Sequence, residues 1–109
     1  MKYTILQLDI DNPNVLRDHK LYESWDILNK TAGFNINQYK KVYEGDVDET
    51  AGKEQQISVL DYLFMKFNLN HPDDFKGHSL SVSDVVILDG VKYYCDNYCW
   101  VNIETGENI

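Results

Sequence analysis

The chain has 109 residues, of which 43% are hydrophobic, and 18 acidic residues outnumber 10 basic ones, giving a formal net charge of −8 at pH 7. This length suits one domain, which can bury a core without support from a metal or a disulfide. The acidic balance disfavours direct nucleic-acid binding, which needs a net basic surface to contact phosphates. It favours a basic protein partner, or serves solubility alone.

The apolar pattern predicts neither a membrane span nor a secretion signal. No apolar run approaches the roughly 18 residues that a membrane helix needs. Residues 1–10 lack a long apolar stretch and already contain Asp9, which is unlike a signal peptide. We therefore expect a cytoplasmic protein in which Cys95 and Cys99 are reduced thiols.

The first predicted element is a strand over residues 2–10. Leu6 and Leu8 share one face of this segment, and Tyr3 lies on the other, an alternation typical of strands. Residues 11–14, Asp-Asn-Pro-Asn, favour a turn that ends it.

A helix is predicted next, because Leu21, Trp25 and Leu28 are spaced at i, i+4 and i+7. Asp18 is the expected N-terminal cap, and Gly33 is the expected stop.

A second strand is predicted over residues 38–44. In a regular strand, Tyr39, Lys41 and Tyr43 would share one face. An acidic loop over residues 45–52 would follow it.

The strongest helical pattern covers residues 54–68. Its apolar stripe contains Ile57, Leu60, Leu63, Phe64 and Phe67. A helix with so wide an apolar stripe is expected to pack on a sheet.

A polar loop over residues 68–78 is predicted to follow the long helix. After a short alternating stretch, Asp84 marks a turn or bulge, and residues 85–88 form a continuous apolar run typical of a buried strand. Asp89-Gly90 predicts a type I′ hairpin turn, with residues 91–103 as the partner strand.

These elements give the order β-α-β-α-β-β in a single α+β domain over residues 1–109. The final hairpin is antiparallel by construction. We therefore expect a small antiparallel or mixed sheet, packed against one long helix and a shorter N-terminal helix.

One dense motif stands out between the long helix and the predicted hairpin. Residues 67–86 read FNLNHPDDFKGHSLSVSDVV, and Tyr93-Tyr94-Cys95-Asp96 follows. Together these segments resemble the YodL-like family, small bacterial proteins and domains often carried on mobile elements. The close match covers about residues 60–98. It departs at His78, where the family usually has Arg, and at residues 98–100, where Tyr-Cys-Trp replaces a Gly-Phe-like ending. The resemblance implies a small α+β domain with no established enzymatic activity.

The candidate site is this motif, which is either an interaction surface or a structural corner. Ser81 and Asp84 have the Ser-x-x-Asp spacing of a capping box, which favours the structural interpretation. A nucleophilic serine would need a base and an orienting group that the sequence does not indicate. The candidate residues are His71, Pro72, Asp74, Gly77, His78, Ser79, Ser81, Ser83, Asp84, Tyr94 and Asp96.

A metal site is a weaker alternative. His71, Asp73, Asp74 and His78 offer suitable ligands, but their spacing matches no standard motif. We therefore expect no metal and no cofactor.

Two further groups lie in the predicted last strand. Cys95 and Cys99 would face the same side about 13 Å apart, too far to form a disulfide. Tyr94, Tyr98 and Trp100 would share one face, which is either core or a protein-binding patch.

The leading hypothesis is a non-catalytic protein-binding module that engages a bacterial protein as an accessory product of a mobile element. One alternative is an acidic DNA mimic that inhibits a DNA-binding or restriction protein. Another is a small hydrolase or metal-binding protein. The sequence leaves the oligomeric state open.

Overall fold

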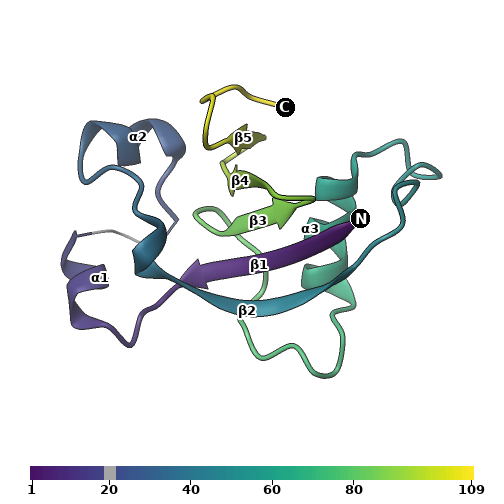
Figure 1. Ribbon diagram of the computed structural model, residues 1–109, viewed down its shortest axis with the longest axis horizontal. Helices are drawn as coiled ribbons and strands as arrows, with labels where there is room; N and C mark the ends of the chain where they lie inside the picture. Colours follow the sequence, from purple (N-terminus) through teal and green to yellow (C-terminus); the bar gives the residue numbers. More distant parts are fainter. Residues whose placement is uncertain (19–21) are drawn as a thin grey trace.

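The centre of the molecule is a five-stranded sheet with the order β2-β1-β3-β4-β5, in which every neighbouring pair is antiparallel (Figure 1). The computed structural model describes residues 1–18 and 22–109. The strands are β1 Lys2–Leu8, β2 Tyr39–Asp46, β3 Val85–Leu88, β4 Val91–Cys95 and β5 Trp100–Asn102. This arrangement confirms the expected α+β class with an antiparallel sheet.

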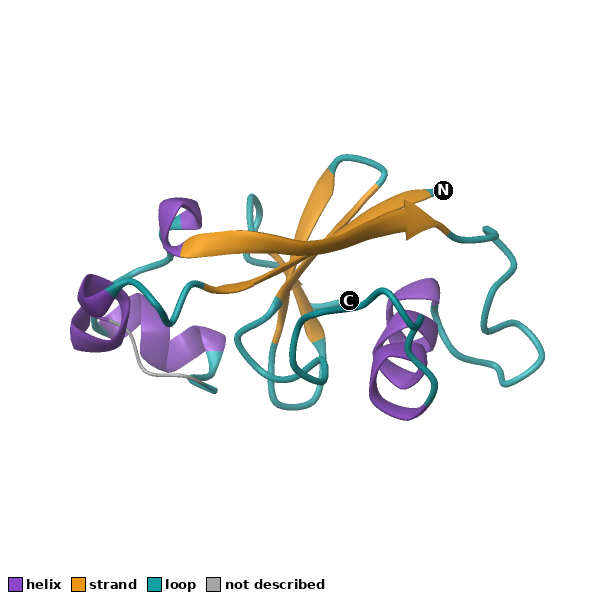
Figure 2. Cartoon of the chain, turned by 90° about the horizontal axis from the view of Figure 1, so that it is seen from below, coloured by secondary structure: helices purple, strands orange, loops and turns teal. Residues whose placement is uncertain are grey.

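The helices gather at the two ends of the sheet (Figure 1). Helices α1 Pro13–Asp18 and α2 Trp25–Lys30 lie at one end with the 3₁₀ turn η1 Ile36–Gln38. Helix α3 Val59–Leu69 lies at the other end. Figure 2 shows the same separation from below the sheet. Within the described residues, no helix combines the length and apolar character that a membrane crossing needs.

The predicted turn at residues 11–14 is wrong in part, because Pro13 opens α1. Proline suits the first position of a helix, where its missing N–H would have no partner. Helix α2 is shorter than predicted and is capped by Ser24, whose Oγ accepts from Ile27 N at 3.3 Å, so the predicted cap at Asp18 is wrong. The expected stripe position Leu21 lies outside the described residues.

Helix α3 begins at Val59, five residues later than predicted. Ser58 caps it by accepting a hydrogen bond from Asp61 N at 3.1 Å. The preceding residues turn instead, because Gly52 has φ +86° and its carbonyl accepts from Ile57 N at 3.0 Å. Gly52 adopts this left-handed conformation without the steric cost of a side chain.

A bulge in β2 overturns the prediction that Tyr39, Lys41 and Tyr43 share one face. Ile5 lies opposite Tyr43, but the next residue of β1 lies opposite Lys41, so Val42 is an extra residue. One extra residue shifts the alternation. Tyr43 consequently packs in the cluster that contains α3, and Tyr39 packs in the cluster that contains α2.

The predicted last strand is in fact two strands. Asp89 and Gly90 have φ +47° and +83°, which confirms the type I′ turn after β3. After β4, however, residues 96–99 form a second turn, closed by a hydrogen bond from Asp96 N to Cys99 O at 2.9 Å.

This second turn changes the positions of the side chains predicted for one long strand. Cys95 packs in the cluster with α3, whereas Cys99 packs in the cluster with α2, so the prediction that they face the same side is wrong. Tyr94 and Trp100 are likewise on opposite faces, and Tyr98 lies fully exposed in the turn.

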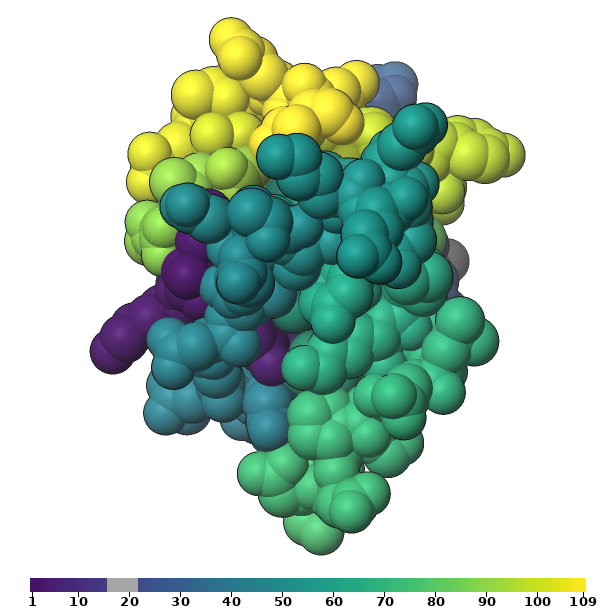
Figure 3. All heavy atoms as spheres, turned by 90° about the vertical axis from the view of Figure 1, so that its right-hand side faces the viewer, coloured from purple at the N-terminus to yellow at the C-terminus, as the bar shows by residue number. Residues whose placement is uncertain are grey.

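The two clusters place one hydrophobic core on each face of the sheet. The larger core joins Tyr3 and Ile5 of β1 to Leu63 and Phe67 of α3. The smaller core joins Val85 and Tyr94 to Leu28 of α2. Figure 3 shows the side of the molecule on which α3 covers the larger core. There α3 and the loops around it are teal and green, and the C-terminal segment is yellow.

Replacement of Leu63 by Ala should lower the free energy of unfolding by about 2–5 kcal/mol, because Leu63 is fully buried and its loss leaves a cavity. Leu69→Ala, on the exposed end of the same helix, should change it by less than about 0.5 kcal/mol. Urea unfolding of both variants checks this, and equal losses would contradict the assigned face of α3.

Candidate functional site

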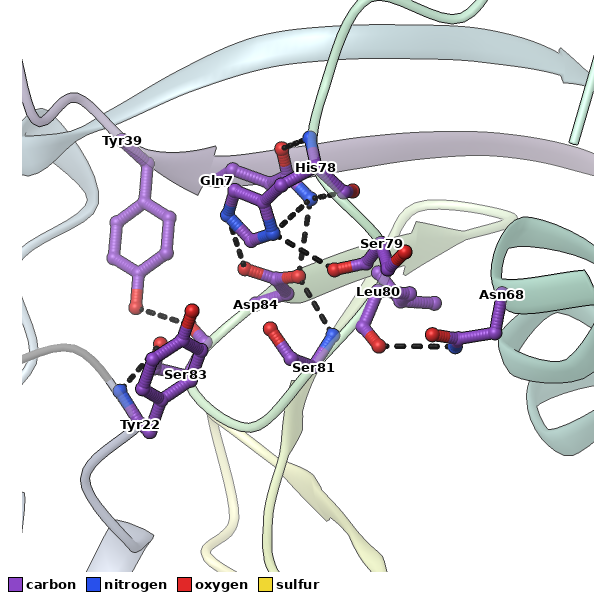
Figure 4. Close-up of polar contacts among 10 residues, drawn as sticks. All are labelled: Gln7, Tyr22, Tyr39, Asn68, His78, Ser79, Leu80, Ser81, Ser83 and Asp84. Carbon is purple, nitrogen blue, oxygen red and sulfur yellow. Dashed lines mark hydrogen bonds and ion pairs between the residues drawn. The ribbon is translucent and has the colours of Figure 1, made fainter.

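The motif that stands out in the sequence forms a polar corner between α3 and β3 (Figure 4). Asp84 is its deepest member, with 1% of its surface exposed. Its Oδ2 accepts hydrogen bonds from Ser81 N at 2.9 Å and from Gln7 Nε2 at 3.1 Å. A buried carboxylate needs such donors, because leaving it unpaired would cost several kcal/mol.

Gln7 connects the corner to the centre of the sheet. Its side chain is buried, and its Nε2 also donates to His78 O at 2.8 Å while its Oε1 accepts from His78 N at 3.1 Å. Gln7 was not among the residues predicted for the site. The sequence does carry a signal for it, because Gln7 lies on the same face of β1 as the core residues Tyr3 and Ile5. A polar side chain on that face needs buried hydrogen-bond partners.

His78 covers the outer side of Asp84. Its Nδ1 lies 2.7 Å from Ser79 O and 3.3 Å from Gln7 Nε2, so it donates to the carbonyl in one tautomer and accepts from the amide in the other. Its Nε2 faces Asp84 Oδ1 at 3.8 Å. The ring therefore lies directly beside the carboxyl group.

Burial raises the pKa of Asp84 to about 7, and His78 and the N–H donors of Ser81 and Gln7 offset only part of this effect. Loss of hydration disfavours the charged carboxylate more than these partners favour it. The corner therefore gains or loses a proton near neutral pH.

Gly77 allows the chain to pass close to Gln7. A Cβ at this position would lie 2.5 Å from Gln7 Oε1 and 2.9 Å from the Phe75 ring. Any side chain would push the Gln7 amide out of its contacts. Gly77 is thus a steric requirement of the corner.

Ser81 and Ser83 shape the turn before β3. The Asp84 carboxylate reaches back to Ser81 N, as in a capping box, but among the described residues Ser81 Oγ has no hydrogen-bond partner, so the box is only half formed. Ser83 has φ +84°, and its N–H donates to Cys95 O at 2.9 Å. Its carbonyl accepts from Tyr39 Oη at 2.6 Å. These bonds hold a backbone conformation that is strained for serine.

A second set of motif residues holds the segment that leads into α2. Tyr94 Oη donates to Glu23 O at 2.7 Å. Asp96 Oδ1 accepts from Trp25 N at 3.1 Å, and Ser83 Oγ accepts from Tyr22 N at 3.3 Å. The family segment Tyr-Tyr-x-Asp therefore fixes residues 22–25 against the sheet.

The remaining motif residues lie in the outer loop. His71 is exposed and its Nδ1 is 2.9 Å from Pro72 O, while Asp74 accepts from Tyr43 Oη at 3.0 Å. Among the side chains that the structure describes, no group of three or more His, Cys, Asp or Glu is placed to hold an ion.

The serine hydroxyls and the Cys95 thiol near the corner differ in their contacts. Within the described residues, Ser81 Oγ has no hydrogen-bond partner, and Ser83 Oγ accepts from Tyr22 N. Burial raises the pKa of the Cys95 thiol to about 12, which keeps it protonated and poorly nucleophilic.

An exposed hollow lies beyond the corner, between α3 and the turn that joins β4 to β5. It holds about 170 Å³, and its lining residues are Asp61, Phe64, Cys95, Asp96, Asn97, Tyr98, Cys99 and Trp100. We call it the hairpin hollow. Trp100 is buried and its Nε1 donates to Asp61 Oδ1 at 3.0 Å. Of the candidate motif residues, only Asp96 reaches it.

Replacement of Asp84 by Asn should flatten the dependence of stability on pH. A carboxyl whose pKa is raised by folding stabilises the fold below its unfolded pKa near 3.8, and that contribution is lost as the pH rises through about 7. The free energy of unfolding of Asp84→Asn, relative to the unmodified protein, should thus rise between about pH 4 and about pH 7. Urea unfolding across this range measures it. Asp73→Asn, in the exposed loop, is the matched control, and parallel profiles for Asp84→Asn and the unmodified protein would contradict the assignment.

Replacement of Tyr94 by Phe should cost about 1–2 kcal/mol, because it leaves the Glu23 carbonyl without its donor. Amide exchange of α2 should accelerate more than exchange in β1, since the lost bond anchors only the segment before α2. Tyr98→Phe, whose side chain is fully exposed, should be neutral. Uniformly faster exchange in Tyr94→Phe would argue against a local anchor.

The comparison with family models agrees with the resemblance seen in the motif. A comparison with curated proteins finds no match, and neither does a comparison with solved structures. The family model of the YodL-like domain matches residues 2–105, nearly the whole chain. With its motif built into the corner and into the anchor of α2, this chain belongs to the YodL-like family.

Proposed function

We propose that this YodL-like protein is a non-catalytic binding module that captures a basic segment of a bacterial protein at the hairpin hollow. The expected setting, from the family, is that of an accessory protein of a mobile element. The observation that carries the proposal is the exposure of Tyr98, 100%, at the rim of this hollow.

Exposed aromatic residues at this place favour a protein partner. Tyr98 extends from a turn, and Phe64 on the neighbouring helix is 37% exposed. Water contact with large apolar rings is unfavourable, and tyrosine is among the residues that dominate binding at protein interfaces. Trp100 supports the hollow from below, held by its hydrogen bond to Asp61.

The size and charge of the hollow favour one long cationic side chain. Its volume of about 170 Å³ is below the 300–1,000 Å³ typical of small-molecule sites. Two carboxylates, Asp61 and Asp96, belong to the lining. The Oδ1 atom of Asp61 accepts from Trp100 Nε1, and that of Asp96 accepts from Trp25 N. A lysine or arginine side chain can pair with carboxylates and can lie over aromatic rings. In the hollow, the rings available for such a contact are those of Tyr98 and Phe64. The net charge of −8 would speed the approach of a basic partner.

The polar corner supports the proposal in a different way. Gln7, His78 and Asp84 satisfy one another inside the molecule, and they fix the loop that precedes β3. Their contacts account for the density of the motif without a substrate. The binding surface is then expected where aromatic groups remain exposed.

Titration with an arginine-rich peptide tests the proposal. The indole N–H resonance of Trp100 should shift, because this group forms part of the hollow, and it should shift more than that of Trp25 at the start of α2, which is not in the lining. Tyr98→Ala should weaken binding by about fivefold, the effect of losing roughly 1 kcal/mol of cation–π contact. Tyr22→Ala, also exposed, is the matched control.

Host lysate provides the second arm of the test. A protein retained by the unmodified chain and by Tyr22→Ala, but lost with Tyr98→Ala, would support the proposal. A Trp100 resonance that does not move at millimolar peptide, or equal binding by Tyr98→Ala, would overturn the hollow as a cation site.

A further inference from the structure

The two edges of the sheet differ sharply in how their backbone groups are covered. At the β5 edge the C-terminal segment turns back along the strand. Asn102 N donates to Glu107 O at 2.9 Å, Ile109 N donates to Trp100 O at 2.9 Å, and Val101 forms a bridge with Asn108. This segment occupies the pairing groups of β5, so that edge is closed to a further strand.

In the described part of the chain, the β2 edge has no comparable cover. Figure 2 views the molecule from this side and shows a long strand crossing the front with no helix or loop drawn over it. β2 has eight residues, the longest strand of the sheet. A long uncovered edge is a template for pairing with another strand.

The register of the sheet identifies which β2 residues face outward. Lys2 O accepts from Asp89 N, so Lys2 faces β3, and by alternation Thr4 and Leu6 do as well. Their partners on β2 are Glu44 and Lys41. Since Thr4 and Leu6 use their backbone groups on the β3 side, the N–H and C=O groups of Glu44 and Lys41 turn away from the sheet.

The charges on this edge are self-complementary. Basic Lys40 and Lys41 occupy its first half, and acidic Glu44 and Asp46 its second half. The Lys41 and Glu44 side chains are 55% and 65% exposed, with Nζ and Oε1 3.3 Å apart. Lysines and a bulge discourage pairing with an arbitrary strand, but an antiparallel copy of β2 can place Glu44 opposite Lys41.

We infer that β2 pairs antiparallel with β2 of a second copy, joining two sheets through a two-fold axis near Val42 and Tyr43. In this register Lys41 of each copy lies opposite Glu44 of the other, which keeps both side chains on the same face. The bulge falls at the axis in both copies, so the irregularity of one strand matches that of the other. The association needs neither the hairpin hollow nor its partner, so the two proposals can fail separately.

Sedimentation equilibrium of charge-reversal variants tests the pairing. Lys41→Glu and Glu44→Lys should each weaken self-association about tenfold or more, because each sets like charges opposite one another. The double variant carrying both changes should recover it, since the attraction is restored with reversed signs. Lys53→Glu, in the loop between β2 and α3, makes the same charge change as Lys41→Glu but away from the edge, and it should have no effect on self-association.

Amide exchange at increasing protein concentration gives an independent readout. The amides of Lys41 and Glu44 should become protected as the dimer forms, whereas the Tyr43 amide, which faces β1, should not change. A chain that stays monomeric at several hundred micromolar, or a dimer indifferent to both single reversals, would overturn the inference.

Discussion

The buried pairing of Gln7 with Asp84 is the constraint on which much of the remaining structure depends. An amide and a carboxylate so deep in the molecule need partners, and the chain supplies them from three places: β1, the loop at His78 and the turn at Ser81. Meeting that need brings the loop before β3 against the core face of β1. It also explains Gly77, since a side chain there would collide with the amide. The polar corner and the larger core therefore form together, because both need β1 and the loop before β3 to come into contact.

Much of the fold could be predicted from local chemistry. The Asp89-Gly90 turn, the buried strand before it and the apolar stripe of α3 follow from patterns within a few residues. The errors occurred where the deciding contact is distant in sequence. The bulge at Val42 depends on β1, and the turn after Cys95 depends on a register that no local pattern reveals. For the site, the motif itself was found, but Gln7 was not, because its partners lie more than seventy residues away.

The family motif divides into parts with different tasks. Gly77, His78 and Asp84 belong to the corner, whereas Ser83, Tyr94 and Asp96 hold the segment before α2. Asp96 has two structural roles, since it anchors Trp25 and also lines the hairpin hollow. A residue with both tasks couples the position of α2 to the shape of the hollow. His78 closes the outer side of the corner, with its Nε2 3.8 Å from Asp84 Oδ1.

The position of β1 in the sheet has a consequence for how the chain is made. β1 is the second strand of the sheet, and its inner neighbour β3 pairs Ile5 with Val86. As the chain leaves the ribosome, β1 can pair with β2 once residue 46 has emerged, but its inner side stays open until β3 follows. During that interval, the apolar residues of β1 and α3 lack the strands that later cover them. Contacts this distant in sequence are slow to form and leave apolar surface exposed while they wait. The final third of the chain therefore closes a core that the first residues begin.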